Sequence, residues 1–184
     1  YTRLGASMPP LVLNLRKNLI VLLGLLPLLL AWHGLALPDL TAAEVAICLL
    51  SGLIGIGLAD TLYFRALNAV GAAAMGIVGN FFSPFVIVLA FVFLGERLSA
   101  PQLAGFALVS AGVLAIGTAR SGTLEAAQLR RGLGLGVLAV LLMAVAIVMV
   151  KRVLEHGDLL WVSAIRMLGG VAGMLVASAM QRDA

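Results

Sequence analysis

The chain has 184 residues, of which 62% are hydrophobic and 11% are charged, and its mean hydropathy is +1.15. A soluble domain of ordinary composition carries about a quarter of its residues as charged side chains, so this composition indicates a membrane protein. The net charge of +4 comes without a basic face or an RNA-binding signature, and we expect no nucleic-acid partner. The single cysteine, Cys48, lies in an apolar run and can form no internal disulfide.

Apolar runs predict six transmembrane helices, each close to the length of about 20 residues that spans a bilayer. They cover residues 17–37, 43–66, 71–94, 101–119, 131–151 and 158–180. The alternation with a period of two that a membrane barrel needs is not found in the sequence. The links are short, so neighbouring helices run antiparallel. We therefore expect an all-α integral membrane protein built as a multi-helix bundle.

The first and last predicted helices begin with the segments PPLVLNLRKNLIVLLG and DLLWVSAIRMLGGVAG, which are thinly similar and each have an arginine near the entry, Arg16 and Arg166. The last helix is the fifth after the first, so the two run in opposite directions. If the match is real, it indicates an inverted repeat of five-helix units. Small-residue spacing also predicts close helix contacts at three pairs: Gly105 and Gly112, Gly132 and Gly136, and Gly169 and Gly173.

Asp60 follows a run, residues 45–58, that has no charged side chain. A carboxylate at a helix centre in the bilayer costs roughly 2.5–3.5 kcal/mol on insertion scales. Three interpretations are open: a proton-titrating or substrate-binding group, a hydrogen-bond acceptor between helices, or a group near enough to the interface to be solvated. Tyr63 lies three positions on, on the same helix face, and is a candidate partner in a substrate pathway.

Asn80, Ser83 and Pro84 form a second polar group within the predicted helix 71–94. Proline has no N–H and clashes with the carbonyl four residues back, so Pro84 frees the Asn80 carbonyl and predicts a kink. These residues either line a substrate pathway or simply satisfy the freed backbone. Arg166 lies deeper than a typical interfacial anchor, and both a functional and an anchoring role are open.

Enzyme signatures are missing from the sequence. It has no phosphate-binding loop, no HExxH motif and no Cys or His pairs at metal-ligand spacing. We therefore predict a protein that is not an enzyme and needs no metal or cofactor.

Several motifs between Gly57 and Gly117 occur together: YFRAL, the helix with Pro84, GERLS at 95–99, QLAG at 102–105 and AGVLAIG at 111–117. In this combination the chain resembles an EamA-type member of the drug/metabolite transporter superfamily. The resemblance implies ten helices in two inverted repeats, and hence that this chain is a fragment lacking the first and last helices. Residues 1–119 would then be helices two to five of the first repeat, 120–130 the inter-repeat loop, and 131–184 the first two helices of the second.

Within GERLS, Gly95 is expected to end one helix, and Glu96 and Arg97 to begin the turn into the next, where Pro101 suits a helix start. We interpret this motif as structural.

The resemblance also implies a function: a secondary transporter, an exporter or exchanger, moving a small metabolite by alternating access between the inverted repeats. The expected surroundings are the lipid bilayer, as a multi-pass protein of the cell (inner) membrane, with protons as a candidate coupling ion. Two alternatives are open. One is an integral-membrane enzyme acting on lipid-linked phosphate, and the other is a membrane scaffold subunit that transports nothing.

Overall fold

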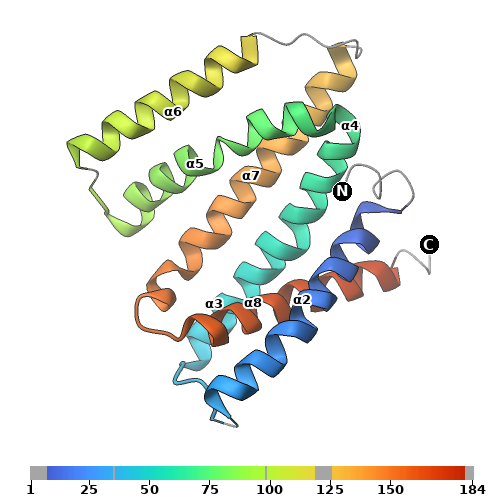
Figure 1. Cartoon of the computed structure of the whole chain (residues 1–184), viewed down its shortest axis with the longest axis vertical. Coiled ribbons are helices and arrows are strands. Elements are labelled where there is room, and N and C mark those ends of the chain that lie inside the picture. Colours follow the sequence, from blue (N-terminus) through green and yellow to red (C-terminus); the bar gives the residue numbers. More distant parts are fainter. Residues whose placement is uncertain (1–7, 35, 98, 119–125, 181–184) are drawn as a thin grey trace.

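A computed structural model describes residues 8–34, 36–97, 99–118 and 126–180, and every element in these ranges is a helix (Figure 1). The α-helices are α2 (Pro10–His33), α3 (Ala42–Gly52), α4 (Asp60–Gly79), α5 (Phe82–Leu89), α6 (Ala100–Thr118), α7 (Ala126–Leu154) and α8 (Leu159–Met180). Two π-helical segments, η1 (Leu53–Ala59) and η2 (Ala90–Leu94), continue α3 and α5.

Four helical stretches of the described chain are long and apolar enough to cross a membrane: Pro10–His33, Ala42–Gly79, Ala127–Leu154 and Leu159–Met180. The second of these combines α3, η1 and α4. These stretches confirm the predicted all-α membrane bundle.

Two predicted boundaries differ from the structure, and one predicted break is found with a second break after it. The first helix begins at Pro10 rather than 17, because a proline at the first helical position is preorganised for a helix start. The predicted break near 66–71 is found at Gly71, whose backbone is non-helical (φ 82°, ψ 168°), and a second break at Asn80–Phe81 divides the predicted helix 71–94. The predicted loop 120–130 overlaps α7, which already begins at Ala126, and its first residues lie outside the described ranges.

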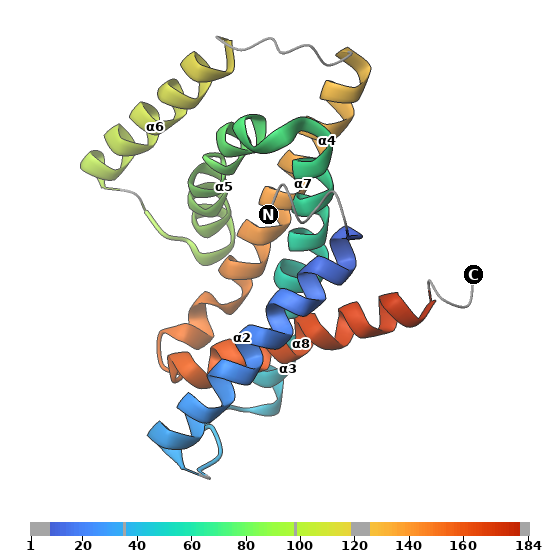
Figure 2. The same ribbon diagram turned by 45° about the vertical axis from the view of Figure 1, so that its right-hand side comes forward.

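The helices from the two ends of the chain pack against each other. Helix α7 lies along α4, and α8 contacts α2, α3 and η1, whereas α6 lies at the outer edge of the bundle beside α5 (Figures 1 and 2). One buried cluster, which we call the Phe64 cluster, joins residues of α4 to Val140 of α7. Another, the Cys48 cluster, joins α3 to α7 and α8 through Val150 and Val162.

Glycines allow α3 and α8 to approach at backbone distance. A Cβ atom on Gly52 would lie 1.7 Å from the Arg166 carbonyl oxygen, and one on Gly169 would lie 2.2 Å from the Leu49 carbonyl oxygen. The predicted contacts are confirmed at Gly169 and Gly173 and at Gly132 and Gly136 of α7, which meet neighbouring side chains or backbone. The prediction for α6 is wrong in the described structure, where Gly105 and Gly112 face open space.

Candidate functional site between α2, η1 and α4

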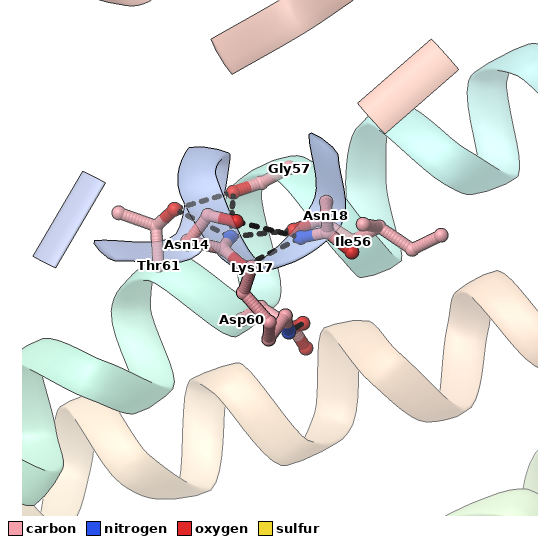
Figure 3. Close-up of polar contacts among 7 residues, drawn as sticks. All are labelled: Asn14, Lys17, Asn18, Ile56, Gly57, Asp60 and Thr61. Carbon is pink, nitrogen blue, oxygen red and sulfur yellow. Dashed lines mark hydrogen bonds and ion pairs between the residues drawn. The ribbon is translucent and has the colours of Figure 1, made fainter. Parts of the chain in front are cut away.

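Asp60 is paired with a cation from another helix. Its Oδ2 lies 2.5 Å from Nζ of Lys17 on α2, and the two side chains are 24% and 26% exposed (Figure 3). At 1.5 Å per residue, Lys17 lies about 10 Å into α2, and Asp60 about 16 Å from the kink at Gly71. The pair therefore lies within the apolar length of the candidate spans, nearer one end than the other.

A buried amide network adjoins this ion pair. Nδ2 of Asn14, which is fully buried, donates to the Ile56 carbonyl at 2.7 Å and to Oγ1 of Thr61 at 3.0 Å. Asn18, also buried, donates to Oδ1 of Asn14 at 2.8 Å (Figure 3). These bonds connect α2 to the segment that carries Asp60 and satisfy side chains that would otherwise be costly to bury.

The π-helical segment η1 explains why α2 finds acceptors on its neighbour. In a π-helix the N–H bonds five residues back, and the Asp60 N–H here bonds to the Gly55 carbonyl. The Ile56 carbonyl accepts from Asn14, and the Gly57 carbonyl accepts from the Thr61 hydroxyl at 2.6 Å. Single π turns within α-helices are frequent at functional sites.

Aromatic rings of α4 lie beside the ion pair. The Lys17 ammonium lies 5.3 Å from the centroid of the Phe64 ring, within the range of a cation–π interaction. Tyr63 packs edge-on against Phe64, and its hydroxyl lies 3.9 Å from the position a Cβ would take on Gly79. Tyr63 thus lies between the Asp60 region and the helix break at Asn80.

Arg166 approaches η1 from α8. Its Nη2 lies 3.9 Å from the Cβ position of Gly55, and its Nε is buried with no hydrogen-bond partner in the described part of the chain. The side chain is half-buried. Cations of α2 and α8 therefore approach the same segment, η1 with Asp60.

A cavity of about 390 Å³ adjoins the network between α2, η1–α4 and α8. Thr61 and Gly57 line it on one side and Met174 of α8 on another, with Arg65 also in its wall. Most of its lining is apolar, and the polar cluster reaches it through Gly57 and Thr61.

Asn80, Ser83 and Pro84 lie apart from the cluster. Asn80 and Ser83 are exposed, and Nδ2 of Asn80 donates to the Gly76 carbonyl of its own helix at 3.0 Å. Pro84 lies in the first turn of α5, just after the break at Asn80–Phe81. The substrate-pathway role of these three residues stays a prediction.

Within GERLS the structure describes residues 95–97 and 99, and the structural interpretation of this motif stays a prediction. Gly95 ends η2 in the left-handed conformation (φ 70°), which favours glycine. Glu96 forms an ion pair with Lys151 near the end of α7, and Arg97 is exposed.

Sequence reasoning missed most of the cluster, namely Asn14, Lys17, Asn18 and Thr61. Asn14, Lys17 and Asn18 have i, i+3, i+4 spacing, which places three polar side chains on one face of a helix. That signal was available, but starting the helix at residue 17 left Asn14 outside it. The π turn that supplies the acceptors has no comparable pattern in the sequence.

The helices and the polar cluster define a polytopic membrane protein with an ionised site between its spans. A model of the EamA-like transporter family matches residues 1–118, and the chain belongs to this family. No curated protein and no solved structure matches the chain. The described residues hold no group of three or more His, Cys, Asp or Glu side chains arranged to bind a metal ion.

Proposed function

We propose that this protein is a secondary transporter that exports or exchanges a small metabolite by alternating access between inverted helix repeats. It works as a multi-pass protein of the cell (inner) membrane. The observation that carries the proposal is the Lys17–Asp60 ion pair, which connects two apolar spans beside a fully buried amide network. Ionised groups within a membrane span are costly and are typical of solute or proton pathways.

The ion pair supplies a way to couple binding to movement. While Asp60 is ionised, it holds Lys17 and keeps α2 against α4. Protonation of Asp60, or a charged substrate that displaces one partner, removes this attraction. The helices then gain freedom to separate, so that a chemical event at one site shifts the balance between two conformations. Protons are the coupling ion that this chemistry favours.

Arg166 is placed to act from the opposite side of η1. Its buried Nε lacks a partner in the described chain, so the side chain retains a donor for a substrate oxygen. Tyr63 adds a hydroxyl between Asp60 and the break at Asn80. In this proposal Arg166 and Tyr63 recognise the solute, and Lys17 and Asp60 couple it to protons.

The test is proton flux in vesicles that contain the whole protein and a pH-sensitive dye. The vesicles are loaded with mixtures of small metabolites. Other mixtures are then added outside, and those that cause proton movement are identified. Asp60→Asn is expected to abolish the flux, whereas Glu96→Gln, at an exposed turn, is the matched control and retains it. Unchanged pH-dependent flux in a well-expressed Asp60→Asn protein would refute the coupling role.

A further inference from the structure

All four candidate spans have an end in one region, distant from the Lys17–Asp60 pair. His33 ends α2, Ala42 begins α3, Leu154 ends α7 and Leu159 begins α8. A cavity of about 380 Å³ lies among these ends, and we call it the end cavity. His33 lies about 24 Å along α2 from Lys17 at the standard helical rise.

Two histidine–carboxylate pairs line this region. Nε2 of His33 is buried and lies 3.2 Å from Oδ1 of Asp158, a charge contact without hydrogen-bond geometry that joins α2 to the start of α8. Nε2 of His156 lies 2.7 Å from Oε1 of Glu44, which joins the α7–α8 link to α3. Each pair connects the part of the chain matched by the family model to the part that follows it.

Each carboxylate is held in place by a helix start as well as by its histidine. Oδ1 of Asp158 accepts the N–H groups of Leu160 and Trp161 at 2.9 and 3.0 Å. Oε2 of Glu44 accepts the N–H and hydroxyl of Thr41, both at 2.7 Å. The acceptors therefore stay in position whatever the charge of the histidines.

The two pairs also lie at helix ends whose partial charges complement them. His33 is the last residue of α2, and His156 follows the end of α7, where the helix dipole favours a cation. Asp158 and Glu44 lie at the starts of α8 and α3, where it favours an anion. The His156 side chain is largely exposed, whereas the His33 side chain is 23% exposed and its Nε2 is buried.

We propose that His33 and His156 are gating residues, which hold this end of the bundle closed when protonated and release it when they lose the proton. Imidazole side chains ordinarily change charge between pH 5 and 8. A protonated imidazole forms an ion pair with its carboxylate, and loss of the proton leaves a weaker neutral contact in each pair. Opening therefore increases with pH.

Other charged groups also lie near the two histidines. Asp39 lines the end cavity, and exposed Glu155 precedes His156. At the end of α7, Lys151 is already paired with Glu96, and Arg152 is exposed. Glu44 and Asp158 remain the direct partners.

This inference rests on the proposed transport function, because a gate at one end complements a coupling pair in the other half of the spans.

Cys48 provides a native reporter. It is the only cysteine, it is 0% exposed, and it lies one turn after Glu44 against Val150 and Val162. A water-soluble thiol reagent reaches it only when the helix ends around the cavity separate.

The experiment measures the rate at which a charged maleimide labels Cys48 in the whole protein in nanodiscs, at pH 5.5 and at pH 8. Three proteins are compared: the parent, His33→Gln with His156→Gln, and His33→Lys with His156→Lys. Glutamine removes the charge, and lysine makes it permanent. Because proteins are compared at one pH, the ionisation of the thiol cancels.

At pH 5.5 the parent is expected to label as slowly as the lysine protein, and the glutamine protein about fivefold faster, since two exposed pairs are weak individually. At pH 8 the parent is expected to match the glutamine protein instead. The gate is refuted if the parent matches one variant at both pH values, or if the two variants label alike.

The emission of Trp161, which lines the end cavity, gives a second readout in a Trp32→Phe protein. It is expected to shift with pH in the parent and to stay constant in both histidine variants. Neither readout needs a transported solute. A working gate without proton flux would therefore refute the transporter proposal alone, and flux without a gate would refute only this inference.

Discussion

Buried polar side chains distinguish this bundle at the scale of single residues. Asn14, Asn18, Ser51 and Thr61 are buried among apolar helices, and each has a hydrogen-bond partner on another helix or within its own. In lipid no water replaces a lost partner, so each of these bonds fixes one arrangement of the helices. Asn14 makes the most of these bonds, because it donates to both Ile56 and Thr61 on the facing segment and accepts from Asn18.

Replacement of Asn14 by alanine is expected to lower the free energy of unfolding by about 1–2 kcal/mol, because Asn18 and the Ile56 carbonyl lose their partner. Asn80→Ala is the matched control. Asn80 is exposed and bonds only within its own helix, so its loss should change stability by less than about 0.5 kcal/mol. Unfolding by SDS in mixed micelles measures the stability of both variants. Equal losses would contradict the buried network.

The Lys17–Asp60 pair predicts non-additive stability changes. Lys17→Met leaves Asp60 ionised without its partner and should destabilise more than the double substitution Lys17→Met with Asp60→Asn. Because both side chains are about one-quarter exposed, we expect a coupling energy of about 1 kcal/mol. A double-mutant cycle of micelle unfolding gives this value. A coupling near zero would mean that solvent already screens the pair.

At the scale of elements, hydropathy predicted the helices and the membrane class but not the polar site. The predicted helix ends near 37, 151 and 180 lie within a few residues of His33, Leu154 and Met180, because apolar runs end where the spans end. Asn14 and Arg16 made the first turns of α2 look like a link, and the acceptors on η1 depend on a local change of helix type. Packing decides whether a backbone N–H bonds to the carbonyl four or five residues back. No residue in the segment LIGIGLA predicts the second pattern.

The close crossing of α3 and α8 predicts that one added methyl group strongly lowers stability. Gly52→Ala would place a Cβ 1.7 Å from the Arg166 carbonyl oxygen, which is backbone and cannot rotate away. We expect a loss of about 3 kcal/mol, at the upper end of ordinary overpacking. Gly24→Ala, in α2, faces open space and is expected to be neutral or slightly stabilising, since alanine favours helix. Micelle unfolding of the two proteins measures the contrast, and similar stabilities would contradict the close crossing.

At the scale of the whole molecule, the two parts of the chain form one core. The Phe64 cluster needs Val140 of α7, and the Cys48 cluster needs residues of both α7 and α8. A Cβ atom on Gly132 of α7 would lie 2.3 Å from Cγ1 of Val70 on α4, so these two helices are also in close contact. A domain that folds alone has its own core, and residues 1–118 share theirs with the helices that follow.

A split protein tests this sharing. Chains of residues 1–120 and 121–184, expressed together with a tag on one, are expected to copurify, because the buried clusters and the glycine crossing lie between them. Residues 1–120 alone expose those apolar faces and should aggregate or be degraded. Gly52→Ala is expected to reduce copurification about tenfold or more, and Gly24→Ala to leave it unchanged. If residues 1–120 alone were monodisperse and as stable as the pair, α7 and α8 would be additions to a complete bundle, and the Lys17–Asp60 site would be supported without them.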